Sequence, residues 1–133
     1  MKRVIEILER TQFGFLATIE NSLPRIRPFH FQFIIENKFF FCTSSEKEVY
    51  RQLVQSSFAE FSVYNKAFEY VIISGQVQFS NDLALKTKVL TNNPFYTDVF
   101  ESEKDEKMIL FYLSNPVIKY GKWGQYPPGI IKY

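Results

Sequence analysis

Cysteine and histidine are almost absent from this sequence, which has one residue of each among 133. A lone cysteine excludes an intramolecular disulfide framework. One cysteine with one histidine is also too few for an all-protein Cys/His zinc site. The sequence offers no visible partners that would make His30 part of a catalytic triad. We therefore assign no catalytic role and no metal site to His30 or Cys42.

The sequence also lacks long apolar runs and a marked excess of either charge. No segment reaches the length of a transmembrane helix, and the N-terminal stretch MKRVIEILERTQFG carries charges throughout, unlike a signal peptide. Sixteen Lys and Arg against fourteen Asp and Glu give a net charge of +2, and the basic residues are scattered. We therefore expect a cytoplasmic protein that binds neither nucleic acid nor membrane.

The motifs of several enzyme classes are missing as well. There is no P-loop, G-x-S-x-G or H-E-x-x-H, and no G-x-G-x-x-G within alternating strands and helices that would indicate a Rossmann sheet. If the protein is an enzyme, we expect a cofactor to supply the reactivity.

Hydrophobic residues make up 46% of the chain and aromatic residues 18%, which predicts a folded single domain over residues 1–133. Alternating and β-branched segments predict a mainly β fold: an antiparallel β-barrel with peripheral helices. The predicted strands cover residues 13–20, 25–35, 39–43, 58–64, 70–79, 107–113 and 117–122, with turns at 20–22, 36–38 and 115–116. Helices are predicted near residues 4–11, from residue 46, and from about residue 83 to the 92–94 stop.

Two places in these strands predict irregular pairing. Gly75 inside strand 70–79 indicates a bulge or a close approach of two backbones, either of which helps to bend a sheet into a barrel. Pro24 and Pro28 lack the N–H that a sheet ladder uses, which favours an edge, a strand start or a bulge. A bulge at Pro28 would reverse the assignment of side chains to faces along that strand.

Two arginines stand at the start of an aromatic strand. Because alternate side chains share a face, Arg25 and Arg27 are predicted to lie in line with Phe29, Phe31, Phe33 and Ile35. Two guanidinium groups at the end of an apolar row cannot be buried unpaired. They must reach water, find carboxylates or meet an anion.

The other end of this region carries a helix-start signal. Ser45 and Glu48 have capping-box spacing, which predicts a helix from Glu46. Lys47 in its first turn is unfavourable unless negative charge lies nearby, and a phosphate would supply that charge. Glu46 and Glu48 also supply it, so an ordinary surface remains the alternative.

The segments FGFLATIENSLPRIRPFHF, NKFFFCTSSEKEVYRQL and EYVIISGQVQF occur in an order that resembles the pyridoxamine 5′-phosphate oxidase-like flavoproteins, in particular their small single-domain members. The similarity extends from about Thr11 to Leu113. The resemblance implies an antiparallel split β-barrel that binds FMN at the interface of a homodimer. The C-terminal stretch WGQYPPGIIKY does not resemble the substrate-binding segment of the pyridoxamine-type oxidases, so the substrate stays unassigned.

The resemblance also suggests roles for individual residues. Thr43 and Lys47 match the hydroxyl and basic contacts of the family to the FMN phosphate, and Arg25 or Arg27 matches its strand arginine. Ser44 adds a second hydroxyl, and the backbone near Pro28 can meet the ribityl chain and ring edge. The predicted cofactor-binding residues are therefore Arg25, Arg27, Pro28, Phe29, Thr43, Ser44 and Lys47.

Three functional hypotheses follow. The first is an FMN-dependent oxidoreductase that passes electrons from a reduced nicotinamide to an unidentified small molecule. In this hypothesis Trp123, Gln125 or Tyr126 could complete the site of the neighbouring subunit; the alternative is that they only pack as an ordinary tail. The second is a non-catalytic flavin- or haem-binding module, in which His30 is the only obvious nitrogen ligand for haem. The third treats the cationic residues as ordinary surface.

Overall fold

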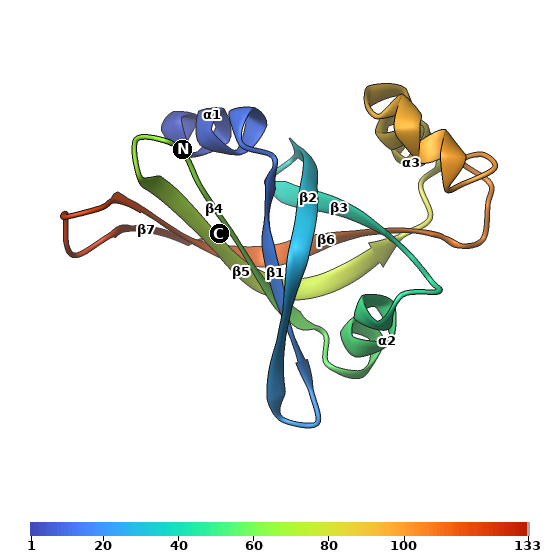
Figure 1. The fold of residues 1–133 in the computed structure, drawn as a ribbon, viewed down its shortest axis with the longest axis horizontal. Coiled ribbons are helices and arrows are strands. Elements are labelled where there is room, and N and C mark those ends of the chain that lie inside the picture. Colours follow the sequence, from blue (N-terminus) through green and yellow to red (C-terminus); the bar gives the residue numbers. More distant parts are fainter. Residues whose placement is uncertain (133) are drawn as a thin grey trace.

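The computed structural model describes residues 1–132, and within that range an antiparallel sheet closes into a barrel (Figure 1). The strand order is β3-β2-β1-β4-β5-β6-β7, and β3 also pairs with β6, so six strands close while β7 extends the sheet beyond β6. The predicted barrel is confirmed. Its elements are α1 (Lys2–Arg10), β1 (Phe13–Glu20), β2 (Leu23–Ile35), β3 (Lys38–Ser44), α2 (Glu48–Gln55), β4 (Phe58–Tyr64), β5 (Glu69–Ser80), α3 (Leu83–Asn92), the 3-10 helix η1 (Pro94–Asp98), β6 (Met108–Lys122) and β7 (Gly129–Lys132).

Two short hairpins build the first half of the barrel. The turn residues Asn21 and Ser22 have φ of 50° and 63°, and Glu36 and Asn37 have φ of 51° and 61°. Positive φ at both central residues is the geometry of a type I′ turn, whose twist matches that of the flanking strands. The predicted turns at 20–22 and 36–38 are therefore confirmed.

The register of β2 is regular through Pro28 and irregular four residues later. Pairing with β1 runs without a break along the whole of β1, so the bulge considered at Pro28 does not form. Gln32 is the extra residue instead, because Phe31 pairs with Phe41 and Phe33 with Phe40. The predicted shared face is therefore confirmed as far as Phe31 and is wrong for its last two members.

The β5–β6 pair contains the second irregularity. The register shifts between Ser74 and Gln76, which places Gly75 against residues 115–116 of β6. A Cβ on Gly75 would lie 2.8 Å from the backbone oxygen of Ser114, so glycine permits this close approach. The bulge predicted at Gly75 is confirmed. The turn predicted at 115–116 is wrong, because the bulge absorbs these residues and β6 continues as one strand.

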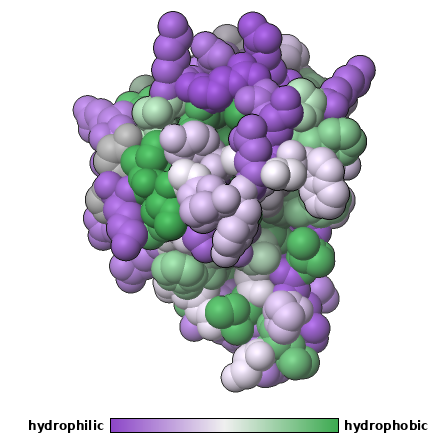
Figure 2. Space-filling model, turned by 90° about the vertical axis from the view of Figure 1, so that its left-hand side faces the viewer, coloured by the Kyte–Doolittle hydropathy of each residue, from purple (hydrophilic) through white to green (hydrophobic). Residues whose placement is uncertain are grey.

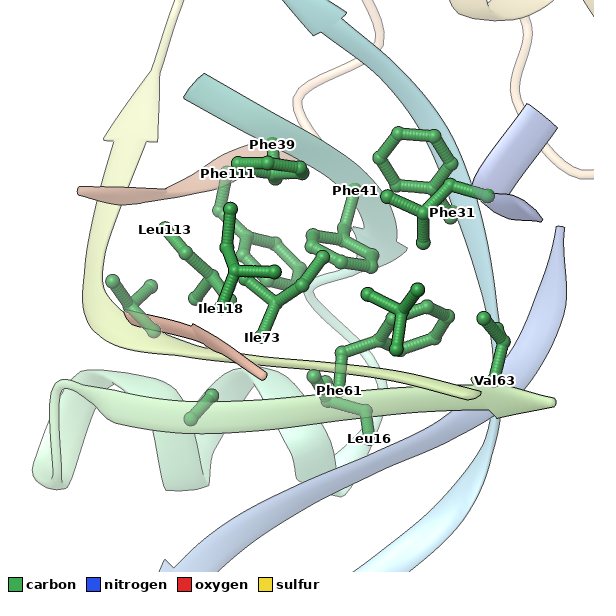
Figure 3. Packing of buried hydrophobic residues seen from close by; sticks show 14 of the residues in the cluster. Leu16, Phe31, Phe39, Phe41, Phe61, Val63, Ile73, Phe111, Leu113 and Ile118 are labelled. Atoms are coloured by element: carbon green, nitrogen blue, oxygen red, sulfur yellow. The ribbon is translucent and has the colours of Figure 1, made fainter. Parts of the chain in front are cut away.

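Two hydrophobic clusters stabilise the fold. The larger fills the barrel, where the Phe41 ring lies 4.9 Å from that of Phe61 and 5.5 Å from that of Phe111 (Figure 3). Such aromatic pairs add stabilisation beyond the area they bury. The smaller cluster draws residues from strands β2, β3 and β6, from α3 and from the segment that follows η1; its buried members are Phe33, Phe40, Val89, Phe100, Met108 and Leu110. The bulge at Gln32 makes this possible by turning Phe33 away from the barrel interior.

The helices begin close to their predicted positions, with one correction. Helix α2 starts at Glu48 rather than Glu46, and no side chain caps it. The Ser44 hydroxyl accepts the Glu46 N–H at 3.2 Å and the Ser44 carbonyl accepts the Lys47 N–H at 3.1 Å, so a turn precedes the helix and the predicted capping box does not form. Among residues 1–132, no helix combines the length and apolarity needed to cross a bilayer.

Candidate functional site

A pocket of about 220 Å³ brings together residues from the middle of β2 and the end of β3. Four of the seven predicted cofactor-binding residues line it, namely Pro28, Phe29, Thr43 and Lys47. A larger hollow of about 360 Å³ beside α1 is less promising, because its Arg3 and Glu69 are already paired with each other. The complete lining of the β2–β3 pocket is Phe13, Pro28, Phe29, His30, Cys42, Thr43, Lys47 and Tyr96.

The β3 end of this pocket carries polar groups without partners. Thr43 is 5% exposed, and its hydroxyl has no hydrogen-bond partner within residues 1–132. Lys47 is exposed, and in the same part of the chain its ammonium forms no ion pair. Buried hydroxyls are normally satisfied, so an unpaired one is a candidate partner for a bound group. A hydroxyl beside a cation suits an anionic, oxygen-rich group.

Arg27 does not reach this pocket. One Nη donates to the Leu16 carbonyl at 3.2 Å and to the Thr18 hydroxyl at 2.8 Å, and the other donates to the Gln52 side-chain oxygen of α2. Burial lowers the pKa of the Arg27 guanidinium, while the carboxylates of Glu48 and then Glu20 act in the opposite direction. We call Arg27, Thr18 and Gln52 the Arg27 cluster.

Arg25 lies further along β2 and meets a carboxylate. Its Nε donates to Glu20 at 3.3 Å, and Arg51 of α2 lies 2.6 Å from the other oxygen of the same carboxylate. Arg51 first, and then Arg25, hold the pKa of Glu20 below its usual value. The structure thus gathers Thr43 and Lys47 in one pocket but not the two arginines, which lie toward the projecting β1–β2 hairpin (Figure 1).

A buried polar network forms another wall of the pocket. His30 Nδ1 lies 2.8 Å from the Tyr96 hydroxyl, and His30 Nε2 lies 3.1 Å from the Gln12 side-chain oxygen. Gln32 Nε2 lies 3.4 Å from the Tyr96 oxygen, and Asn93 Nδ2 donates to Gln32 at 2.8 Å. The Gln12 oxygen only accepts, so this arrangement assigns the proton to Nε2 and leaves Nδ1 as an acceptor. Burial lowers the pKa of His30, which favours this neutral form. We call these five residues the His30 network.

Sequence reasoning did not identify Phe13 or Tyr96 as pocket residues. The Phe13 ring stacks on His30 at 4.2 Å with an interplanar angle of 11°, and Phe13 remains 66% exposed. Its position could have been read from the turn at 20–22, which sets Phe13 opposite His30. Tyr96 lies 66 positions after His30, and nothing local in the sequence indicates this contact.

Cys42 also lines the pocket, and burial disfavours its thiolate form there. Burial raises its pKa to about 12, although the positive charges of Lys86 and Lys47 act in the opposite direction. The thiolate is the nucleophilic form of cysteine. The arrangement therefore suits binding and orientation rather than covalent chemistry by the protein.

Several solved structures share this fold. A NimC/NimA family protein from Clostridium acetobutylicum has a TM-score of 0.86 and 24% identity, covering 100% of this chain and 92% of that protein. A haem-binding protein from Mycobacterium smegmatis has a TM-score of 0.79 and 14% identity, covering 97% and 56%. A pyridoxamine 5′-phosphate oxidase-related, FMN-binding protein from Nostoc punctiforme has a TM-score of 0.72 and 18% identity, covering 97% and 87%. At these identities the likeness establishes the fold alone.

Comparison with protein families is more specific than comparison with individual proteins. No curated protein matches the chain significantly. The model of the family described as pyridoxamine 5′-phosphate oxidase matches residues 1–112, which is most of the chain and includes the β2–β3 pocket and the His30 network. The chain therefore belongs to the pyridoxamine 5′-phosphate oxidase family.

Proposed function

We propose that this protein binds FMN and acts as an FMN-dependent oxidoreductase, passing electrons from a reduced nicotinamide to a small molecule. The observation that supports this most is the unpartnered Thr43 hydroxyl in a pocket that Lys47 also lines. A phosphate monoester offers acceptor oxygens and negative charge, so it would satisfy both groups. The FMN-binding relative from Nostoc punctiforme supports the same choice of ligand.

Different residues of the pocket would bind different parts of FMN. Thr43 and Lys47 would hold the phosphate, and Pro28 and Phe29 would provide the apolar side of the passage beyond it. Ser44 would act indirectly. Its hydroxyl accepts the Glu46 N–H and its carbonyl accepts the Lys47 N–H, and these two bonds form the turn that presents Lys47. FMN itself would supply the redox chemistry when bound.

We further propose that two copies of the chain form a homodimer that completes the site. A pocket of about 220 Å³ is smaller than the roughly 300–1,000 Å³ usual for sites that enclose a drug-sized ligand. Next to it, the outer face of β1 and β2 exposes Phe13, Phe15 and Ile26 by 66%, 49% and 70%. Figure 2 shows apolar side chains among polar ones on the projecting lower part of the molecule. Exposed apolar patches of this kind mark interaction surfaces.

The end of the chain is a candidate for reaching the second site of this dimer. Trp123 is 81% exposed and Tyr126 is 91% exposed, with Gln125 between them. Aromatic side chains of this kind are enriched at protein interfaces. We propose that these residues contact the partner subunit beside its cofactor.

The haem-binding alternative finds less support at the same pocket. It needs an axial ligand, and His30 is the only histidine of the chain. Both nitrogens of His30 already lie within hydrogen-bonding distance of Tyr96 and Gln12. We therefore favour FMN, and we expect added haem to give no Soret band of a histidine-ligated species. A non-catalytic flavin module would use the same residues and would differ only in lacking turnover.

A titration with FMN and riboflavin tests the phosphate site, because the two flavins differ only in that group. We expect saturable binding of FMN that is much tighter than binding of riboflavin. Lys47→Ala should weaken FMN binding about tenfold or more, since a charge-assisted contact contributes about 1.5–3 kcal/mol, and should leave riboflavin affinity unchanged. Lys104→Ala is the matched control, because Lys104 is exposed and lies outside the pocket.

Equal affinity for the two flavins, or unchanged FMN affinity in Lys47→Ala, would reject the site.

Two further measurements separate the parts of the proposal. Oxidation of a reduced nicotinamide by the FMN-loaded protein distinguishes an enzyme from a binding module. Sedimentation at increasing protein concentration tests the dimer, and Ile26→Lys should shift it to monomer because the new charge would have to be buried.

A further inference from the structure

The hydroxyl of Tyr96 reaches the pocket with most of its hydrogen-bonding capacity already used. A tyrosine hydroxyl donates one hydrogen bond and accepts two. Its proton points to His30 Nδ1 at 2.8 Å, because Nε2 of His30 donates to Gln12. Gln32 approaches the oxygen at the long distance of 3.4 Å. The Tyr96 oxygen therefore faces a pocket occupant as an acceptor and not as a donor.

The surroundings of Tyr96 hold this oxygen in place. The Gln32 side chain is fixed by Asn93, which also donates to the Val89 carbonyl at 2.8 Å. The His30 ring is held from another side by Phe13 at 4.2 Å. His30, Gln32 and Asn93 are all more than nine-tenths buried. A satisfied buried network of this kind is rigid, so Tyr96 is pre-organised for an occupant.

The size and charge of the pocket decide which part of a ligand meets Tyr96. Lys47 and Thr43 suit the phosphate, and a volume of about 220 Å³ leaves room for a chain beyond it but not for a fused three-ring system as well. In FMN the group next to the phosphate is the ribityl chain. Its hydroxyls are the donors nearest to the phosphate, and a donor is what the Tyr96 oxygen requires.

We propose that Tyr96 is a specificity-determining residue whose hydroxyl oxygen accepts a hydrogen bond from one hydroxyl of the ribityl chain. This rests on the proposed function, in which the same pocket holds the phosphate of FMN. The contact makes the pocket select phosphorylated flavins with an intact polyol chain. Burial raises the pKa of Tyr96, so the phenol stays neutral, keeps its proton and donates it to His30 Nδ1.

The test is a binding titration of FMN and of three FMN analogues, each lacking one ribityl hydroxyl, against wild type and Tyr96→Phe. A net hydrogen bond of about 0.5–1.5 kcal/mol corresponds to about a 2- to 13-fold change in affinity. We expect one analogue to bind wild type more weakly by this factor. Tyr96→Phe should bind FMN more weakly by the same factor and should not distinguish that analogue from FMN.

Tyr112→Phe is the matched control, because Tyr112 packs against the smaller hydrophobic cluster and lies outside this pocket. It should reproduce the wild-type affinities for all four ligands. Tyr96→Phe should remain folded, since Gln32 Nε2 lies 3.3 Å from His30 Nδ1 and can replace the lost donor. Equal unfolding midpoints for wild type and variant would check this directly.

The outcomes separate the two proposals. If wild type binds FMN no better than riboflavin, the proposed function fails and the role of Tyr96 fails with it. If wild type prefers FMN but Tyr96→Phe shows wild-type affinity, or discriminates among the analogues as wild type does, only the role of Tyr96 fails. A merely structural role would weaken every ligand equally and leave the discrimination intact.

Discussion

The Arg27 cluster and the β3 end of the pocket contain the same kinds of residues and differ in one partner. Each holds a buried threonine, since Thr18 is 2% exposed and Thr43 is 5% exposed. The Thr18 hydroxyl donates to Gln52 at 2.6 Å and accepts from Arg27 at 2.8 Å. The Thr43 hydroxyl has no partner in the described part of the chain. Composition alone therefore does not separate a structural polar cluster from a binding site.

What separates them is the third group, Gln52 on α2. Its side-chain oxygen accepts from both Arg27 and Thr18, and Gln52 is 1% exposed. The cluster is thereby closed, with a neutral acceptor compensating a half-buried charge. Nothing within residues 1–132 plays that part for the Thr43 hydroxyl, which leaves its hydrogen-bonding capacity unused. The comparison predicts that mutations in the cluster change stability and that mutations in the pocket change binding.

Arg27→Ala should have the largest effect on stability. It leaves Leu16, Thr18 and Gln52 short of a donor, and we expect a loss of about 2 kcal/mol in the free energy of unfolding. Arg25→Ala removes an exposed ion pair and should cost less than about 1 kcal/mol. Urea unfolding of both variants measures the difference. A loss of FMN affinity in Arg27→Ala comparable to that in Lys47→Ala, with little loss of stability, would mean that Arg27 binds ligand and that the cluster is not closed.

The two threonines should respond in opposite directions to the same change. Thr18→Val removes a satisfied hydroxyl and deprives the Gln52 side-chain oxygen of one donor. We therefore expect it to lower the free energy of unfolding by about 1 kcal/mol. Thr43→Val replaces an unsatisfied buried hydroxyl with a methyl group, so it should be neutral or stabilise by up to about 1 kcal/mol while weakening FMN binding. Thermal unfolding and FMN titration of the pair measure both effects. Equal destabilisation by the two substitutions would remove the distinction between the two sites.

Local patterns in the sequence predicted most of the fold, and long-range partners account for the errors. Alternation along β4 and β5, the β-forming residues of β1 and the turn signals at 20–22 and 36–38 were enough to predict the barrel. The bulge at Gln32 was not visible, because it depends on how β2 pairs with β3. The continuity of β6 through residues 115–116 likewise depends on Gly75 of β5. The Asn115-Pro116 pair is typical of a turn, and the local sequence does not show that the neighbouring strand β5 accommodates these two residues within β6.

The same distinction holds within the candidate site. Thr43 and Lys47 lie within five positions of each other, so spacing alone was enough to group them, and they line one pocket. The arginines were expected to meet water, carboxylates or an anion. Arg25 pairs with the Glu20 carboxylate, whereas Arg27 donates to neutral oxygens on β1 and α2. The strand pattern did not indicate these neutral partners. Tyr96 was missed because η1 reaches the pocket only through the tertiary fold.

The smallest expected effect is a pH dependence from the His30 network, which sharpens the comparison because the His30 ring, like the Arg27 guanidinium, has its hydrogen-bond partners within the chain. Burial lowers the pKa of folded His30 below its ordinary 6.5, so the unfolded chain takes up the proton first as the pH falls. Stability should therefore be full above about pH 6.5 and decline as the pH drops toward the folded-state pKa. The carboxylates of Glu20, Glu69 and Asp105 act in a separate window, because their lowered pKa values place their loss below about pH 4.5. Urea unfolding at about pH 7.5 and about pH 5.5 should show a decrease in wild type that is reduced in His30→Gln, since glutamine does not titrate. An equal decrease in both proteins would assign the effect to groups other than His30, and it would mean that the protonated imidazole is tolerated beside Tyr96 and Gln12.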